Sequence, residues 1–394
     1  MNIATKTTAQ REKNVPVLDS LTASQIAAIR SIPPHSDASP PAIDARRPTS
    51  IFLSQDHYDL EQDKIFRAVP VPITLSALVA EPGSLIAIDS YGIPLLVTRA
   101  RDGEVRVFLN ACTHKGSKLI EDNEPHATGR MSCPYHAWTY GLDGKLIGVP
   151  RSETIANFCK DDRPLAQLPA REAGGLIWAG LDRKRDYDFS IIDDQLAADF
   201  DALNMGSAHV YGRKTFTLKA NWKLVFEPFL EGYHVQRLHA ASVGPMFADV
   251  PTITDRLGQH FRQTSGKVNF DPALITPEEN IHKSVTFAYQ LIPNTVIITS
   301  PYYISVMILA PRGPDCTVVD YTMLTREAPD NPKAEALFEK SYNMVLGVFG
   351  NEDFRAAELS HAGLATGAMD DVIYCGLEDK IPEFYNTLEA LLAR

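Results

Sequence analysis

Four potential metal ligands lie close together in the chain, as two pairs of one cysteine and one histidine. The first pair is Cys112 and His114, and after 18 intervening residues the second pair follows at Cys133 and His136. Two thiolates and two imidazoles suit a Rieske-type [2Fe–2S] cluster, in which the cysteines bind one iron and the histidines the other. We therefore predict that two separate loops hold such a cluster, with each loop giving one ligand to each iron.

A structural zinc site is the alternative, because zinc is also bound by sets of two cysteines and two histidines. Zinc motifs usually place two cysteines together and then two histidines. In this chain the two residue types alternate. The alternation favours the iron–sulfur cluster over zinc.

The residues around these ligands carry a resemblance to a known family. The runs Cys-Thr-His-Lys-Gly from Cys112 and Cys-Pro-Tyr-His-Ala-Trp from Cys133 resemble the ferredoxin half of the Rieske non-haem iron oxygenases. Members of this family are the terminal components of ring-hydroxylating and demethylating systems. Lys115, Tyr135 and Trp138 are expected either to tune the cluster by hydrogen bonding and burial or to pack around it.

A second group of potential ligands comprises Glu231, His234 and His239. Two histidines and a later carboxylate could form the facial triad of a mononuclear Fe(II) site with open positions for O₂. A spacing of three places Glu231 and His234 on one helix face, but a spacing of five turns His239 about 140° away from His234. Both histidines can reach one metal only if the helix loosens, for example in a π-type turn, or ends.

The pair of histidines is a weak signal by itself, but its setting strengthens it. The stretch from Asn221-Trp222-Lys223 to His239 resembles the iron motif of the same oxygenases. The resemblance implies a carboxylate ligand further along the chain. Asp353 is the expected ligand, because residues 351–358 resemble the family's late Glu-Asp…Glu segment, and Asp370 or Asp371 is the alternative. The neighbouring titratable residues are expected to be surface groups without a role: Glu352, Glu358 and His361.

The resemblance gives Glu231 a separate role. In the family, an acidic residue three positions before the first iron histidine links that histidine to a cluster histidine of the neighbouring subunit. This residue is usually Asp, but a subset that includes enzymes acting on quaternary amines has Glu, as here. Head-to-tail packing into a ring would bring the two centres together, so a homotrimer is expected. A helix-surface carboxylate is the alternative for Glu231, and Pro228 departs from the family pattern near the helix start.

Composition and length set the broad class of the protein. The chain has 394 residues, of which 44% are hydrophobic and 22% charged, which fits two globular domains. The net charge of −11 argues against a nucleic-acid partner, which calls for a basic surface. Residues 1–13 lack the apolar segment of a secretory signal, and no apolar run approaches the roughly 18 residues that span a bilayer. A cytoplasmic location without membrane insertion is expected.

Three cysteines remain outside the proposed cluster, at Cys159, Cys316 and Cys375. Their odd number and scattered positions indicate no disulfide framework. Free thiols of this kind fit a reducing compartment.

Residue patterns predict the α+β class, with an all-β cluster domain followed by a mixed domain. Strands are expected in the first domain, with hairpin turns at Asp102-Gly103 and Asp143-Gly144; the strand ranges are 85–88, 94–98, 105–109 and 176–181. The second domain is expected to contain strands at 210–218, 295–299, 303–309 and 316–323. Helices are expected at 21–32, 56–66, 221–239, 334–352 and 381–393.

We expect three parts along the chain: an N-terminal arm and helix over 1–62 that packs on the catalytic domain, the Rieske domain over 63–183, and the catalytic domain over 184–394. The resemblance implies that the last part is a helix-grip domain, an antiparallel sheet around a long helix with the pocket over the iron. The candidate pocket residues are apolar and near the iron helix: Phe226, Phe229, Leu230, Met246 and Phe247.

The resemblance, which covers about residues 50–360, implies a terminal oxygenase. The chain has no Gly-x-Gly-x-x-Gly after a strand and no plant-type ferredoxin cysteine run. Electrons from NAD(P)H should therefore arrive through a separate reductase, with or without a ferredoxin. The expected substrate is an organic compound, aromatic or polycyclic, that is mono- or dihydroxylated with O₂. The alternatives are oxidative demethylation of a quaternary amine or of a methoxy or N-methyl compound, and a non-catalytic Rieske electron carrier.

Overall fold

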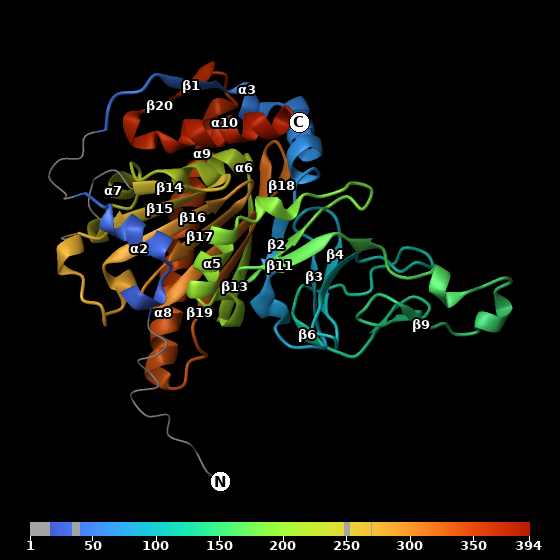
Figure 1. The fold of residues 1–394 in the computed structure, drawn as a ribbon. Coiled ribbons are helices and arrows are strands. Elements are labelled where there is room, and N and C mark those ends of the chain that lie inside the picture. The colour runs from blue at the N-terminus through green and yellow to red at the C-terminus, as the bar shows by residue number, and fades with distance from the viewer. Residues whose placement is uncertain (1–15, 34–39, 248–252, 269) are drawn as a thin grey trace, which may run out of the picture.

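The computed structural model describes residues 16–33, 40–247, 253–268 and 270–394. These residues form a smaller lobe of strands, which extends to the right in Figure 1, and a larger lobe of helices and strands. The predicted α+β class with an all-β first domain is confirmed. In the described part of the chain, no helix combines the length and the apolar character needed to cross a membrane.

The smaller lobe is built from short antiparallel strands that form three sheets, in the orders β10-β5-β4-β3-β6, β11-β12-β2 and β7-β8-β9. The strands are β2 (Val71–Leu75), β3 (Ser84–Ile88), β4 (Leu95–Arg99), β5 (Val105–Leu109), β6 (His126–Ala127), β7 (Met131–Ser132), β8 (Thr139–Tyr140), β9 (Leu146–Gly148), β10 (Gln167–Leu168), β11 (Ala170–Ala173) and β12 (Leu176–Ala179). The predicted turn at Gly103 joins β4 to β5, and the one at Gly144 joins β8 to β9. Both glycines have φ above +80°, a left-handed conformation that glycine adopts at little cost.

The larger lobe contains one antiparallel sheet of seven strands in the order β13-β19-β18-β17-β16-β15-β14. The strands are β13 (His209–Leu218), β14 (Ile253–Leu257), β15 (His260–Gly266), β16 (Val285–Leu291), β17 (Thr295–Thr299), β18 (Tyr303–Gly313) and β19 (Cys316–Thr325). All four strands predicted for this domain are confirmed, and β14, β15 and β16 are additional. Strand β16 does alternate apolar residues, but β15 carries buried polar residues on both faces, with Arg262 and Thr264 on one and Gln263 on the other.

The helices lie on both faces of this sheet and over its edge (Figure 1). They are α2 (Ala23–Arg30), α3 (Ser50–Leu53), α4 (Gln55–Glu61), α5 (Asp194–Ala202), α6 (Trp222–Phe226), α7 (Val235–Leu238), α8 (Pro332–Val348), α9 (Phe354–Leu364) and α10 (Lys380–Leu392). Two π-helical turns continue α4 and join α8 to α9, namely η3 (Gln62–Phe66) and η13 (Phe349–Asp353). Short 3₁₀ helices complete the set: η2 (Leu18–Ser20), η4 (Ser76–Val79), η5 (Ser152–Thr154), η6 (Lys160–Asp162), η7 (Phe189–Ile191), η8 (Met205–Ser207), η9 (Glu227–Leu230), η10 (Gly244–Met246), η11 (Pro272–Leu274), η12 (Ile281–Lys283) and η14 (Gly376–Glu378).

The single helix predicted over 221–239 is wrong. Helix α6 ends at Phe226, the 3₁₀ helix η9 follows with Pro228 in its first turn, and Glu231 is extended with φ −146° and ψ 174°. Proline cannot donate a backbone hydrogen bond and clashes with the preceding turn, so it interrupts a helix. A new helix, α7, begins at Val235 and ends at Leu238.

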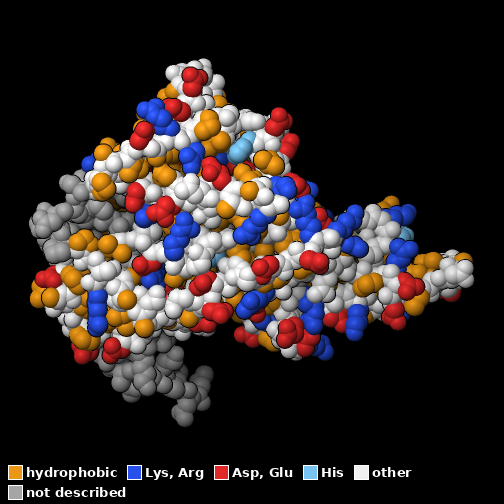
Figure 2. All heavy atoms as spheres, turned by 45° about the horizontal axis from the view of Figure 1, so that its top comes forward, with side chains coloured by type: hydrophobic (Ala, Val, Ile, Leu, Met, Phe, Trp, Pro, Cys, Tyr) orange, Lys and Arg blue, Asp and Glu red, His pale blue; other side chains and the backbone are white. Residues whose placement is uncertain are grey.

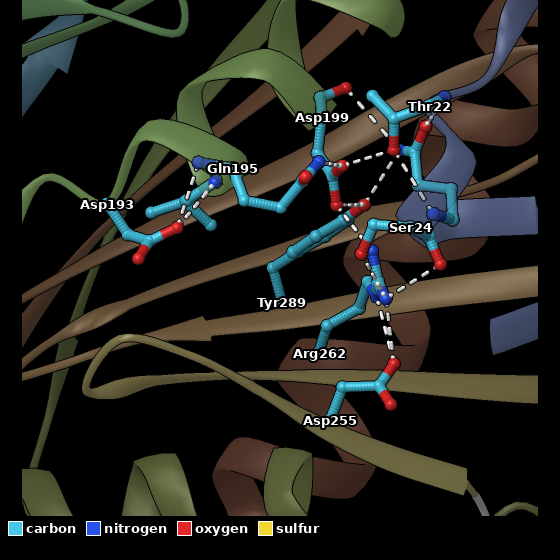
Figure 3. A network of polar contacts seen from close by, with 10 residues as sticks. Thr22, Ser24, Asp193, Gln195, Asp199, Asp255, Arg262 and Tyr289 are labelled. Carbon is cyan, nitrogen blue, oxygen red and sulfur yellow. Dashed lines mark hydrogen bonds and ion pairs between the residues drawn. The ribbon is translucent and has the colours of Figure 1, made fainter. Parts of the chain in front are cut away.

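A buried polar network fixes the N-terminal helix α2 to the sheet (Figure 3). The carboxylate of Asp199 on α5 accepts hydrogen bonds from the Thr22 hydroxyl at 2.6 Å and from the Tyr289 hydroxyl at 3.0 Å. Arg262 donates to Asp199 at 2.7 Å and to Asp255 at 2.8 Å, and its side chain is only 2% exposed. Buried charges are tolerated when they are paired and hydrogen-bonded in this way.

Two segments far apart in the sequence pair at the top of the larger lobe in Figure 1. Strand β1 (Ala45–Pro48) pairs antiparallel with β20 (Asp371–Tyr374). On the face seen in Figure 2, acidic and basic side chains are interspersed, without a continuous area of either sign.

Candidate metal centres

The four predicted cluster ligands come together at one end of the smaller lobe. Cys112 and His114 lie on the loop after β5, and Cys133 and His136 on the loop between β7 and β8. The thiols are buried, with Cys112 3% and Cys133 4% exposed, and they belong to a hydrophobic cluster with Leu96 and Phe108. The imidazoles of His114 and His136 lie further out, with ring centroids 4.7 Å apart.

The two loops have the same backbone design. The N–H of Cys112 donates to the Ser117 carbonyl and that of Cys133 to the Trp138 carbonyl, both at 2.8 Å. Four residues after each cysteine, a residue with positive φ turns the chain: Gly116 at +79° and Ala137 at +56°. The repeated turn presents both cysteines and both histidines toward the same space.

The donor set fits a Rieske cluster. Burial raises the pKa of the Cys133 thiol, but hydrogen bonds from the backbone N–H groups of Tyr135 and His136 and from the Cys112 and Ser117 side chains together outweigh it, so this pKa is lowered. A lowered pKa favours the thiolate that binds iron. The buried Nδ1 of His114 has no hydrogen-bond partner among the described residues, as expected of an atom reserved for another partner.

Aromatic residues surround the cluster position. The indole of Trp138, 6% exposed, lies parallel to the His114 ring with centroids 4.7 Å apart and planes 6° apart. Tyr135 is 62% exposed and lies beside His136, and the ammonium of Lys115 lies 5.8 Å from the Tyr135 ring centroid. Sequence reasoning missed Tyr140, whose hydroxyl contacts the Cys112 sulfur. Its residue type could have drawn attention only as a buried aromatic seven positions after Cys133.

The second predicted ligand set also converges. His234, His239 and Asp353 each offer one ligand atom, and these atoms lie within 4.8 Å of one another. Nε2 of His234 lies 3.5 Å and Nε2 of His239 3.3 Å from Oδ1 of Asp353. This buried oxygen has no hydrogen-bond partner among the described residues. Two imidazoles and one carboxylate around a space of this size are the ligands of a mononuclear Fe(II) site.

The break in the predicted helix is what allows both histidines to reach this point. His234 is the residue before α7 and His239 the residue after it, so the four-residue helix ends between the two ligands. The expectation that the helix must loosen or end is confirmed, and it ends. Asp353 is the last residue of the π-helical turn η13, a type of turn that is frequent at functional sites.

The residues of the Asn-Trp-Lys run position the segment that carries the iron ligands. The Asn221 side chain caps α6 by accepting the Lys223 N–H at 3.1 Å and donates to the Phe52 carbonyl at 3.0 Å. Trp222 and Lys223 donate to the two oxygens of Glu61 on α4, at 2.8 and 2.6 Å. These contacts fix α6 to the N-terminal helices and so fix the start of the ligand segment.

Glu231 contacts His234, although the two residues do not share a helix. Its Oε1 lies 2.5 Å from Nδ1 of His234, and its Oε2 accepts the His234 backbone N–H at 3.1 Å and that of Tyr233. The predicted shared helix face is therefore wrong, but the predicted proximity holds. The side chain of Glu231 is 7% exposed, which does not fit a helix-surface carboxylate.

Two of the three residues predicted to be surface groups without a role, Glu352 and His361, contact other side chains or the backbone inside the fold. Oε2 of Glu352 contacts Nδ1 of His239 and accepts the Ser242 hydroxyl at 2.7 Å, so the solvated-charge interpretation is wrong. His361 is 8% exposed and its Nδ1 accepts the Asn221 N–H at 3.3 Å, so it is a buried structural histidine. Glu358 accepts the Lys219 N–H at 2.9 Å. Nothing in the local sequence distinguishes Glu352 from Glu358.

The alternative carboxylates and some pocket candidates lie elsewhere. Asp371 starts β20 and pairs with Arg46 at 3.3 Å, next to Asp370. Phe226 stacks on Phe384 of α10, with centroids 5.1 Å apart, and is part of the core. Met246 is 47% exposed and so is not a buried wall.

The remaining apolar candidates stay close to the metal ligands. The ring of Phe229 packs against Phe349, the first residue of η13, with centroids 5.9 Å apart. Phe349 also packs against Tyr321 of β19 at 5.8 Å. Leu230 is 1% exposed and Phe247 is half-buried. An apolar surface therefore lies between the sheet and η13.

Comparison with known proteins gives matches over both lobes. The model of the Rieske [2Fe-2S] domain matches residues 70–159, and the model of the ring hydroxylating alpha subunit (catalytic domain) matches residues 205–394. The carnitine monooxygenase oxygenase subunit of Escherichia coli (strain K12) is 24% identical over 80% of this chain and 83% of that protein. Anthranilate 1,2-dioxygenase large subunit of Burkholderia cepacia is 26% identical over 85% of this chain and 86% of its own length.

A further relative matches over a shorter stretch. The carnitine monooxygenase oxygenase subunit of Acinetobacter baumannii is 27% identical, and the match spans 51% of this chain and about half, 53%, of that relative. Among solved structures, the quaternary ammonium Rieske monooxygenase CntA has a TM-score of 0.74 at 21% identity, covering 88% of this chain and 95% of that one. Naphthalene 1,2-dioxygenase from Rhodococcus sp. has a TM-score of 0.69 at 19% identity, covering 89% and 95%. The chain shares the fold of both.

Proposed function

The chain belongs to the Rieske non-haem iron oxygenases as an alpha, or terminal oxygenase, subunit, and on this basis we propose which residues carry its reaction. Cys112, Cys133, His114 and His136 hold the [2Fe–2S] cluster, and His234, His239 and Asp353 hold the mononuclear iron. The observation that supports the second set most strongly is the meeting of its three ligand atoms within 4.8 Å. The match of residues 205–394 to a catalytic domain argues against a protein that only carries electrons.

When bound, the two centres supply one stored electron and an open site for O₂. The chain's own residues hold and orient these centres. Glu231 accepts a hydrogen bond from Nδ1–H of His234, which leaves Nε2 free for the metal. Phe229 and Phe349 form an apolar surface beside the ligands, and such a surface excludes water from the space where substrate is oxidised.

We propose that electrons pass between neighbouring subunits of a homotrimer. In Figure 1, α7 lies at the far side of the larger lobe from the strands β6 and β9 of the cluster lobe, and His234 and His239 are the residues that flank α7. A head-to-tail ring would bring the cluster of one subunit next to the α7 of another. His234 is 19% exposed and His136 is exposed, so both can reach a partner surface. Glu231 then links the two histidines across the interface.

A separate reductase supplies the electrons from NAD(P)H in this proposal, with or without a ferredoxin, since the sequence carries no nucleotide-binding motif of its own. The first candidate substrate is a quaternary amine, oxidised at a carbon bonded to its nitrogen. It is supported by the likeness to carnitine monooxygenase subunits and by Glu at position 231. The second candidate is an aromatic compound, supported by the match to anthranilate 1,2-dioxygenase over 85% of the chain. The sequence-based preference for an aromatic substrate stays a prediction.

A single-turnover experiment tests this function without the unknown reductase. Protein reconstituted anaerobically with iron and sulfide should contain about three irons per chain, two in the cluster and one mononuclear. It is reduced chemically, mixed with O₂ and either carnitine or anthranilate, and the products are measured. Formaldehyde or another aldehyde from the amine supports the first candidate, and a hydroxylated ring supports the second. Cluster oxidation without any product from a wide panel of both classes would contradict an oxygenase function.

The Glu231→Gln variant tests the bridge. It should retain both metal centres, yet oxidation of its reduced cluster should no longer be coupled to product formation, because the carboxylate between the centres is lost. Glu358→Gln, which removes a carboxylate that accepts the Lys219 N–H, serves as the control. Normal turnover in Glu231→Gln would show that the bridging role is wrong.

A further inference from the structure

Each of the two histidines beside α7 has a glutamate at its Nδ1. Glu231 takes this place for His234, and Glu352 takes it for His239. Both glutamates are held within their own subunit but by different groups: Glu231 accepts the backbone N–H groups of Tyr233 and His234, whereas Glu352 is held by a side chain. Its Oε2 also accepts the hydroxyl of Ser242 at 2.7 Å. One oxygen of Glu352 is therefore held by two partners, the ligand that it contacts and a residue three positions after that ligand.

The ring nitrogens of His239 face two consecutive carboxylates. Nδ1 contacts Glu352, and Nε2 lies 3.3 Å from Oδ1 of Asp353. Two neighbouring residues of a regular helix point about 100° apart, which would carry one of them away from the ring. Here both residues belong to the π-helical turn η13, and both reach the same imidazole.

We infer that Glu352 is a positioning residue that fixes the tautomer and the orientation of His239 for the mononuclear iron. This inference rests on the proposal that His239 binds that iron. The carboxylate accepts Nδ1–H, so the ring presents the lone pair of Nε2 toward the space shared with His234 and Asp353. A carboxylate behind a metal-binding histidine also raises the basicity of the ring. Ser242 prevents Glu352 from rotating toward solvent.

The expected effect is on metal binding. Loss of such a partner typically weakens metal affinity about 10- to 100-fold. Glu352→Gln keeps an oxygen that can accept Nδ1–H but removes the charge, so its Fe(II) affinity should fall by about 10-fold, and Glu352→Ala should approach the upper end of this range. Ser242→Ala leaves Glu352 in place but free to rotate, and it should lower the affinity less, in the same direction.

The test is anaerobic calorimetric titration of Fe(II) into protein whose mononuclear site has been emptied by a chelator while the cluster is retained. A second readout is the electron paramagnetic resonance of the nitric oxide adduct of the ferrous site, whose symmetry reports the orientation of the histidine ligands. The spectrum of the reduced cluster serves as an internal standard for folding. Glu358→Gln, which removes a carboxylate from the following helix without touching a ligand, is the matched control.

Weaker Fe(II) binding in the order Ser242→Ala, Glu352→Gln, Glu352→Ala, with an altered nitric oxide signal and an unchanged cluster, supports the positioning role. Wild-type affinity and an unchanged signal in Glu352→Gln and Ser242→Ala would overturn it. If wild-type protein itself binds no Fe(II) beyond the cluster, the proposed iron site fails and the role of Glu352 fails with it. Should Glu352→Ala not fold, Ser242→Ala and Glu352→Gln still decide the question.

Discussion

The hydroxyl of Tyr140 lies 3.2 Å from the sulfur of Cys112, and it also accepts the backbone N–H of Thr113 at 3.0 Å. A cysteine that binds iron is a thiolate without a proton, so in the loaded protein the hydroxyl is the donor of this pair. Hydrogen bonds to cluster sulfurs stabilise the reduced, more negative state and so raise the reduction potential. A tyrosine that no metal motif includes therefore bears on the electron supply of the whole enzyme.

Replacing Tyr140 by Phe should lower the reduction potential of the cluster. If the hydrogen bond favours the reduced state by about 1 kcal/mol, the decrease is roughly 40 mV for a one-electron couple. A spectroscopic redox titration measures it. Tyr135→Phe is the control, because Tyr135 is 62% exposed. Equal potentials in wild type and Tyr140→Phe would show that the hydroxyl does not act on the cluster.

Substitutions at the two loop turns, Gly116 and Ala137, should have opposite effects on the stability of the bound cluster. Gly116→Ala places a side chain on a backbone with φ +79°, and its Cβ would meet no atom within 4 Å, so the variant reports backbone strain alone. The expected cost is about 1 kcal/mol, seen as faster bleaching of the cluster in a chelator. Ala137→Gly removes the same strain from the second loop and should bleach no faster than wild type. Faster bleaching in both variants would contradict this explanation.

Arg262→Met should strongly destabilise the larger lobe. It leaves the fully buried carboxylate of Asp199 without its cation, and breaking a buried pair in this way costs about 3–5 kcal/mol. Urea unfolding followed by circular dichroism measures the loss. Arg256→Met is the matched control, since Arg256 is 41% exposed and its ion pair with Glu383 is at the surface, worth under about 1 kcal/mol. Similar losses in both variants would argue against the network as the cause.

The carboxyl of Glu227 should make stability depend on pH. Burial raises the pKa of Glu227 to about 7 from 4.5, and the hydroxyls of Tyr385 and Tyr374 only partly offset this. Between these values the folded protein keeps a proton that the unfolded chain has lost, so the free energy of unfolding falls as pH rises through this window. Glu227→Gln should lack this fall and be more stable than wild type above pH 7, by about 2 kcal/mol after allowance for partial exposure.

Thermal unfolding of wild type and Glu227→Gln from pH 4.5 to 8 checks this. The difference between the two should grow with pH and level off once the carboxyl has ionised. The exposed Glu383→Gln variant should run parallel to wild type throughout. Parallel curves for Glu227→Gln as well would show that the carboxyl of Glu227 titrates normally.

Metal analysis separates the two candidate carboxylate ligands. Asp353→Ala should retain the two irons of the cluster and lose the third. Asp371→Ala should keep all three, because Asp371 pairs with Arg46 on a surface strand. Iron and sulfide determination on anaerobically reconstituted protein gives the answer. Loss of the third iron in Asp371→Ala, but not in Asp353→Ala, would reverse the assignment.

The sequence alone was enough to predict a site whose ligands all lie in one short motif. The cluster ligands fall within 25 residues, and the first domain's strands are short apolar runs separated by turn residues. The convergence of His234, His239 and Asp353 was expected from the resemblance to the oxygenase iron motif, and the spacing of the histidines then required a break in the helix. The position of that break was not predictable, since it depends on Pro228 and on the extended backbone of Glu231.

Other features could not be predicted because they arise from contacts between distant segments. Glu352 looks like any helix carboxylate until the fold brings it to His239, 113 positions earlier in the chain. Strand β15 lacks a recognisable apolar pattern because it contains Arg262, which is buried only because α5 and β14 supply its ion-pair partners. The burial of His361 could not be predicted for the same reason, because Asn221 contacts it only in the folded chain.

The pairing of β1 with β20 has a consequence for how the protein is made. During translation, the cluster lobe is synthesised after the first segments of the larger lobe but long before β20 and α10. Domains generally fold as units during synthesis, N-terminal ones first. The cluster lobe can therefore fold and receive its iron and sulfide while the remainder is still being translated, whereas the mononuclear iron must wait for Asp353 to emerge. Nascent chains stalled just after β12 should accordingly accept a cluster but no third iron.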